Sequence, residues 1–259
     1  MREAHSFGVE AVVLRHVDYG EADRILTLFT RQLGKTRAIV KGARKIMSRK
    51  AGHLEPFTHV RLQLAKGRDM PLVTQAEMID AYLPLREDLV LTSQASYVIE
   101  LVDRFTYDEG SDSSGIFQLL IETLARLAEK AEPWMATRFY EMRLLDCLGF
   151  RPKLLECAVC GREIQAEDQY FSYAAGGVVC PTSANDEQVR RSEKLTLRPI
   201  SLEGLRYLRH FQRSSYAEAV RAHPAPEVKQ ETEALMQGFF THLLERELKT
   251  PGFLRQIRR

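Results

Sequence analysis

Long apolar runs are missing from this 259-residue chain: none approaches the ~20 residues that a helix needs to cross a bilayer. The first residues, MREAHSFG, also lack the apolar centre of a secretory signal peptide. Cysteine is scarce, with four residues in all, too few for the disulfide framework of a small secreted protein. Together these absences exclude an integral membrane protein and favour a cytoplasmic location.

Motifs for nucleotide or hydrolytic chemistry are absent as well. There is no phosphate-binding GxxxxGK[ST] loop, no GxSxG, no HExxH and no strand-linked GxGxxG. His53-Leu54-Glu55 has the H-x-E form of zinc deaminases, but the C-x-x-C pair follows 102 residues after Glu55 and has no proline directly before it. We therefore expect none of these enzyme classes.

Positive charge is present in one place. The chain has 37 basic and 35 acidic residues, a nearly even balance, yet residues 31–68 contain eleven basic residues and one acid, Glu55. Basic and acidic side chains mixed along the chain would be enough for solubility, so a stretch with almost only positive charge predicts a polyanionic partner. The alternative is a solvated face that binds nothing. The residues we expect to contact nucleic acid are Lys35, Arg37, Lys41, Arg44, Lys45, Arg49 and Lys50.

The periodicity of the chain predicts two architectures. Five short runs of strand character, separated by turns that contain glycine, fill residues 1–80 and predict a small β-barrel. Residues 81–259 have helical periodicity, interrupted at about 151–198 by a segment richer in glycine and polar residues. The predicted helices cover 85–105, 111–130, 132–149, 201–213 and 226–249. The fold class is thus α+β, with a barrel domain at 1–80 and a helical domain at 81–259 that contains an insertion.

Within the predicted barrel, residues 42–55 lack strand periodicity and predict a long loop between the third and fourth strands. The segment KGARK places Lys41, Arg44 and Lys45 around two small residues, which allow close approach to phosphates. Phe29 and Phe57 could stack on bases, although barrel core is the favoured interpretation for both. Such contacts would bind backbone without reading base identity.

Three cysteines in the insertion have metal-ligand spacing. Cys157-x-x-Cys160 is followed, after nineteen residues, by Cys180-x-x-Ser183. A structural zinc ribbon uses two C-x-x-C turns about 15–20 residues apart, so three of its four ligand positions are present. Ser183 stands in the fourth, where Asp186 or water could also serve, while a ribbon without metal is the alternative. Cys147, at the end of an apolar helix, is expected to be a buried core thiol.

The N-terminal run VLRHVDYGEADRILTLFTRQLGKTRAIVKGARK, followed by LEPF, resembles the RecO family of bacterial DNA repair proteins. The resemblance continues through RFYEMRLLDCLGFRPKLLECAVCG, the FS…GGVVC segment and LLERELKTPGFLRQI, so it covers nearly the whole chain. The matching positions include the turn residues and the basic segment: Tyr19, Glu21, Asp23, Phe29, Thr30, Gly34, Lys41, Gly42, Ala43, Arg44, Lys45, Pro56 and Phe57. The departure is Ser183, where members with a zinc ribbon have a fourth cysteine.

This resemblance implies an OB-fold N-terminal domain, a helical C-terminal domain and, in some members, a zinc ribbon. It implies a non-enzymatic recombination mediator that binds single- and double-stranded DNA, anneals complementary strands, acts with RecR and the C-terminal tail of single-stranded DNA-binding protein, and helps to load RecA. Arg206, Arg209 and Arg213 are basic candidates for contacting that tail. The alternative function is an RNA-binding accessory protein, because barrels and ribbons serve both nucleic acids.

Overall fold

The structure is a computed structural model, and it describes residues 6–45, 51–106, 113–129, 132–192, 196–244 and 250. The chain divides into two compact units, Met1–Pro133 with Gly252–Arg259, and Trp134–Pro251. The class predicted from the sequence is confirmed at the level of an α+β protein with a five-stranded N-terminal sheet followed by a helical region. None of the helices in the described ranges has both the length and the apolar character for a membrane crossing.

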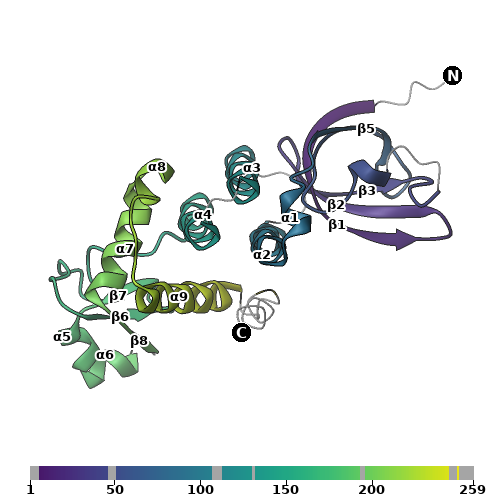
Figure 1. The fold of residues 1–259 in the computed structure, drawn as a ribbon. Helices are drawn as coiled ribbons and strands as arrows, with labels where there is room; N and C mark the ends of the chain where they lie inside the picture. The colour runs from purple at the N-terminus through teal and green to yellow at the C-terminus, as the bar shows by residue number, and fades with distance from the viewer. Residues whose placement is uncertain are drawn as a thin grey trace. The chain divides into compact units, whose positions relative to one another are not determined.

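Five strands form the first unit's sheet, and each matches a predicted run (Figure 1). They close into a barrel in the order β1-β2-β3-β5-β4. Every neighbouring pair is antiparallel except β3 and β5, which meet in parallel where Ile39 pairs with Leu72. The strands are β1 (Ser6–Tyr19), β2 (Asp23–Thr30), β3 (Gly34–Val40), β4 (His59–Ala65) and β5 (Leu72–Asp80).

Alternation along the strands fills the barrel with apolar side chains. In β3, Ala38 and Val40 are fully buried, whereas Arg37, the residue before Ala38, is exposed. The predicted loop 42–55 lies partly outside the described residues, but both of its described ends enter the barrel core. Ala43 is 2% exposed and Leu54, after the short 3-10 helix η1 (Ala51–His53), is 1% exposed.

Three helices complete the described part of the first unit: α1 (Pro84–Glu87), α2 (Leu89–Phe105) and α3 (Ser114–Ala128). The helix predicted over 85–105 is broken at Asp88, because its carboxylate caps α2 by accepting the N–H groups of Val90 and Leu91. Phe117 of α3 stacks on Phe29 of β2, with ring centroids 6.3 Å apart. The helices thus cover one part of the outer barrel surface.

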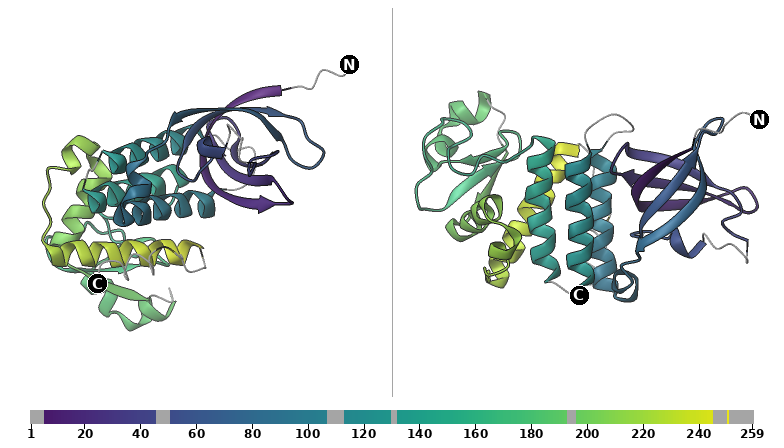
Figure 2. Two further views of the ribbon diagram at one scale, coloured as in Figure 1. Left: turned by 45° about the vertical axis from the view of Figure 1, so that its right-hand side comes forward. Right: turned by 90° about the horizontal axis from the view of Figure 1, so that it is seen from above.

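The second unit contains α4 (Pro133–Leu148), which ends at Gly149 with φ of +79°. A three-stranded sheet follows, built from β6 (Gln169–Ser172), β7 (Gly177–Val179) and β8 (Leu197–Ile200) in the order β7-β6-β8. Figure 2 shows this green part of the chain from two further sides. Two short helices, α5 (Pro181–Asn185) and α6 (Glu187–Ser192), lie between β7 and β8. The remaining helices are α7 (Leu202–Arg213), α8 (Tyr216–Ala219) and α9 (Pro226–Leu244).

Candidate nucleic-acid interface and thiolate cluster

The outer face of β3 and of the residue that follows it carries basic side chains. Arg37, Ile39 and Lys41 alternate with the buried Ala38 and Val40, so the three share the outward face of the strand and its continuation. Arg37 and Lys41 are exposed, and Ile39 between them is partly buried. Two of the residues predicted to bind nucleic acid therefore lie in one line on an open surface of the barrel.

The turn after β3 is fixed against the β1–β2 turn by backbone hydrogen bonds. The N–H of Gly42, which has φ of +65°, donates to Oδ1 of Asp23 at 2.9 Å. The N–H of Arg44 donates to the carbonyl of Ala22 at 2.9 Å. Since Ala43 is buried in the barrel core, the side chains of Lys41, Arg44 and Lys45 are left on the surface. The sequence KGARK thus displays three cations from a turn anchored by its two small residues.

Acidic side chains accompany these cations. Lys41 Nζ lies 2.6 Å from Oδ2 of Asp23, and Arg44 Nε lies 3.4 Å from Oδ2 of Asp18. The hydrogen bond from Lys41 lowers the pKa of Asp23, and the same bond raises the pKa of Lys41. The pair is therefore ionised at neutral pH. Because 65% of the Lys41 side chain is exposed, its ammonium remains open to solvent beside the carboxylate.

The other predicted contacts have different surroundings. Lys35 is only 17% exposed, and its Nζ donates to the backbone carbonyl of Asp103 at 2.7 Å and lies 3.5 Å from the Asp103 carboxylate. Its ammonium is already engaged within the first unit. Arg49 and Lys50 lie outside the described residues. The exposed cations of the described set are consequently Arg37, Lys41, Arg44 and Lys45.

Phe29 and Phe57 are buried, with exposed fractions of 0% and 7%, so neither ring is open to a base. The prediction of barrel core is wrong for Phe29, whose ring packs on Phe117 of α3 outside the barrel. The exposed aromatic residue near the basic turn is instead Tyr19, at the end of β1, with 51% of its surface exposed. Tyr19 pairs with Asp23 across β1 and β2, and Asp23 is the ion-pair partner of Lys41, so Tyr19 lies near the basic turn. The sequence analysis did not single out Tyr19 as a contact residue, although the alternation of Arg15, Val17 and Tyr19 was available as a signal.

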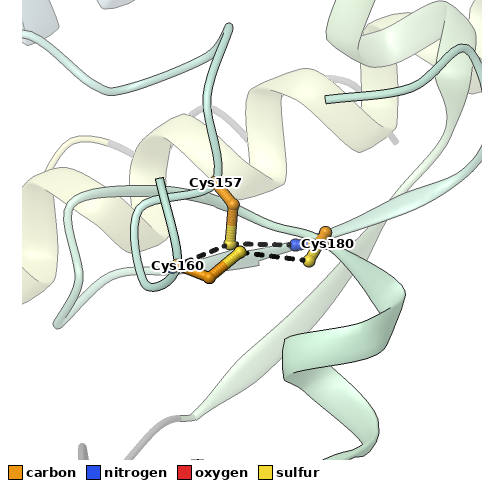
Figure 3. A group of neighbouring side chains, drawn as sticks. All are labelled: Cys157, Cys160 and Cys180. Atoms are coloured by element: carbon orange, nitrogen blue, oxygen red, sulfur yellow. Dashed lines mark hydrogen bonds between the residues drawn. The ribbon is translucent and has the colours of Figure 1, made fainter. Parts of the chain in front are cut away.

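The second site is formed by Cys157, Cys160 and Cys180, whose sulfur atoms lie within 4.8 Å of one another (Figure 3). Sγ of Cys160 and Sγ of Cys180 are 3.7 Å apart, and two thiolates bound tetrahedrally at about 2.3 Å would lie roughly 3.8 Å apart. These three cysteines could bind a metal ion. Cys147 is not a buried thiol as expected: it is exposed at the end of α4, where the helix meets solvent.

Backbone N–H groups donate to the Cys157 sulfur and stabilise its thiolate, which favours binding of a cation. Burial raises the pKa of Cys157, but N–H groups of Cys160, Cys180 and Val159 outweigh it and bring the pKa to about 6. The thiolate, which is the ligand form, is therefore the main species at neutral pH. The turn that directs these N–H groups towards the Cys157 sulfur depends on Gly161. Gly161 has φ of +72° and donates its N–H to the Cys157 carbonyl.

Ser183 occupies the fourth corner of the cluster. Its Oγ lies 3.4 Å from Sγ of Cys180 and 3.8 Å from Sγ of Cys157, and the residue is buried. A zinc-bound oxygen and sulfur would lie about 3.5 Å apart, so a hydroxyl stands where a fourth thiolate would. Asp186, the carboxylate alternative, instead accepts the N–H groups of Gln188 and Val189 at the start of α6.

The three arginines of α7 are in unlike environments. Nε of Arg209 donates to the carbonyl of Leu154 at 2.8 Å, which ties α7 to the inserted segment. Arg206 and Arg213 are exposed. Arg206 also lines an open pocket of about 340 Å³. The other lining residues are Glu203, Tyr207, His210 and Ala222.

Comparison with known proteins decides the family. The model described as "Recombination protein O N terminal" matches residues 1–82, and "Recombination protein O C terminal" matches residues 86–251. The chain belongs to the RecO family. A curated "DNA repair protein RecO" from Roseiflexus sp. (strain RS-1) is 38% identical over 97% of this chain and 86% of its own length. Proteins of the same name from Dehalococcoides mccartyi (strain 195) and Bifidobacterium adolescentis are each 34% identical, covering 100% and 95% of this chain and 99% and 97% of their own.

Membership assigns the chain a role in DNA repair and recombination. The resemblance seen in the sequence is thereby confirmed over both matched regions. The descriptions concern DNA repair and recombination, and they give no support to the RNA-binding alternative.

Proposed function

We propose that the barrel is an OB-fold that binds DNA through the outer face of β1–β3, and that the protein mediates recombination without catalysing a covalent step. The observation that supports this most strongly is the group of exposed cations Arg37, Lys41, Arg44 and Lys45 on one face and its adjoining turn. OB-folds bind oligonucleotides on this part of the barrel. Family membership supplies DNA repair as the context.

Point charges on exposed side chains would neutralise phosphates irrespective of sequence. Both single- and double-stranded DNA are therefore ligands in this proposal. A strand whose phosphates are neutralised repels its complement less, so two complementary strands meet and pair faster. Annealing by this route requires positioning and charge, with no bond made or broken and no nucleotide cofactor.

The proposed domains are the OB-fold at 1–80 and the helical domain at 81–259, with a zinc-ribbon-like insertion at about 151–198. Within the insertion, Cys157, Cys160 and Cys180 would hold zinc, and the Ser183 hydroxyl or water would complete its coordination. Bound zinc would supply structural cross-linking of the ribbon turns. The low pKa of Cys157 favours such binding, while the missing fourth thiolate weakens it.

The proposed partners are RecR, the C-terminal tail of single-stranded DNA-binding protein and, indirectly, RecA, all in the cytoplasm. For an acidic tail the supporting feature is the pocket on α7. It combines the guanidinium of Arg206 with the rings of Tyr207 and His210. A carboxylate beside an apolar side chain would find complementary groups there.

Strand annealing tests the proposed function. Complementary oligonucleotides, bare or coated with single-stranded DNA-binding protein, should anneal faster with the protein and without ATP or metal added. Equal annealing rates with and without the protein would contradict the proposal. Competition between single-stranded DNA and structured RNA of equal length should favour the DNA; a preference for RNA would support the alternative function.

A further inference from the structure

A row of apolar side chains crosses the outside of the barrel. Val17 of β1 pairs with Ile25 of β2, Ile25 pairs with Ile39 of β3, and Ile39 pairs with Leu72 of β5. Directly paired residues point to the same side of a sheet, and the neighbours of Ile25 and Ile39 that point the other way, Leu26 and Ala38, are fully buried. The four side chains therefore form one continuous outer row, which we call the apolar row.

The exposed end of this row is at β1. Val17 is 55% exposed, and Tyr19, two residues further along the same face, is 51% exposed. Ile25, Ile39 and Leu72 are partly buried. Barrel packing does not account for this surface, because the barrel's own core lies on the opposite side of the strands.

Cations flank the apolar row on both sides. Arg15 and Arg37 both pair with Thr27, two residues along β1 and β3 from the apolar row. The Arg15 side chain is 60% exposed, although its Nε lies 3.7 Å from the Asp103 carboxylate. Lys41 and the turn residue Arg44 lie towards the other end, where they pair with Asp23, the strand partner of Tyr19, and with Asp18, its chain neighbour. The surface thus alternates cationic, apolar and cationic bands.

A single nucleic-acid strand matches this order of bands. A single nucleic-acid strand carries phosphates and, within reach of them, flat bases with exposed apolar faces. A duplex has the same phosphates but turns its bases inward, so it could use the cations and leave the apolar row uncovered. An acidic peptide could pair with the cations, but it offers a flat face only where its sequence has an aromatic residue, whereas a nucleic-acid strand offers one at every nucleotide.

We propose that Val17 and Tyr19 contact unpaired bases and make this face prefer single-stranded to double-stranded DNA. The inference rests on the proposed function, because it assumes that the flanking cations bind the DNA backbone. Tyr19 would stack on one base and Val17 would pack against the next, with phosphates held by the bands on either side. The preference would then arise from the protein surface rather than from base sequence.

The test compares the double variant Val17→Thr, Tyr19→Thr with the intact protein, using a single-stranded oligonucleotide and a duplex of equal length at one salt concentration. Threonine keeps strand propensity at these exposed positions. Affinity for the single strand should fall about tenfold, the equivalent of one stacked base, with duplex affinity unchanged. Phe7→Thr is the matched control: Phe7 lies near the other end of β1, is 41% exposed, and its replacement should change neither affinity.

Equal losses for the two DNA forms, or no loss for either, would overturn the inference while leaving DNA binding intact. Failure of the unmodified protein to bind DNA would instead refute the proposed function. The variant Tyr19→Trp gives a second measurement that does not require loss of binding. Its indole fluorescence should be quenched by the single strand and not by the duplex, after subtraction of the signal from Trp134, the chain's one native tryptophan.

Discussion

The carboxylate of Asp23 contacts both the side chain of Lys41 and the backbone of the next residue. Oδ2 lies 2.6 Å from the Lys41 ammonium, and Oδ1 accepts the N–H of the following residue, Gly42, at 2.9 Å. The acid therefore fixes the turn on which the predicted DNA-binding cations stand. The same acid also adds a negative charge to the surface that the backbone of DNA would approach.

The substitution Asp23→Asn should separate these two effects. The amide oxygen can still accept the Gly42 N–H, but the negative charge is gone, so Lys41 is free to neutralise a phosphate. We expect tighter binding to single-stranded DNA and a salt dependence steeper by up to about 0.7 in log–log slope. Weaker binding would mean that the ion pair is needed to orient Lys41. Glu77→Gln, on the exposed part of β5, is the control and should leave binding unchanged.

Lys35 is predicted to contribute to stability through Asp103. Its ammonium donates to the Asp103 carbonyl and lies beside the carboxylate, with little exposure to solvent. The variant Lys35→Met keeps the apolar stem and removes these contacts, so unfolding should become easier by about 1–3 kcal/mol. Thermal unfolding measures the loss. A large fall in DNA affinity without a change in stability would show that Lys35 contributes to DNA binding instead.

The location of Lys35 illustrates what sequence could and could not predict. The sequence shows the positive charge of Lys35, but its partner Asp103 is 68 positions away, and no local pattern links the two residues. The strands were predictable because alternation along β3 separates Arg37 and Ile39 from the buried Ala38 and Val40. The break between α1 and α2 was missed, although Asp88 is a typical N-cap residue, because apolar periodicity continues across it.

The cysteine cluster was predicted more completely than the basic surface proposed to bind DNA. C-x-x-C spacing brings Cys157 and Cys160 together, and the β6–β7 hairpin brings Cys180 to them. Spacing also predicted that Ser183 would occupy the fourth position, and its Oγ lies 3.4 Å from the Cys180 sulfur. What spacing could not predict was the set of N–H groups that lowers the pKa of Cys157.

Ser183→Cys should raise zinc affinity by about tenfold or more, since a thiolate is a better ligand than a hydroxyl. Competition with a chromogenic chelator measures this affinity, and elemental analysis measures the zinc in purified protein. Cys147→Ser, which alters an exposed thiol outside the cluster, is the control. Unchanged affinity in Ser183→Cys would show that the fourth corner is not available to a metal, and a folded protein that takes up no zinc would refute the zinc proposal.

The barrel should lose an ionic contribution to stability in acid. Two hydrogen bonds from Arg31 lower the pKa of Glu10 below its ordinary value of 4.5; partial burial opposes this, and a hydrogen bond with His59 adds to it. A carboxylate with a lowered folded-state pKa contributes stability above its unfolded pKa, and this is lost as pH falls through the folded value.

Glu10→Gln should therefore lower the melting temperature at pH 6–7, by the equivalent of about 1–3 kcal/mol, and the difference should shrink below about pH 4.5. Thermal unfolding of both proteins across this range tests the expectation. If the difference in melting temperature stays constant down to the lowest pH, the substitution acts through something other than charge. Glu77→Gln again serves as control, because the Glu77–Arg61 pair is exposed on both sides.

The central claim is that exposed cations of the barrel bind the DNA backbone, and the salt dependence of binding tests it most directly. Replacing Lys41, Arg44 and Lys45 by alanine should weaken single-strand binding and reduce the log–log salt slope by about 2, as expected for three lost phosphate contacts. Removing equal charge from the exposed Arg190, Arg191 and Arg221 should leave the slope unchanged. An unaltered slope in the first variant, or an equal reduction in both, would contradict the account.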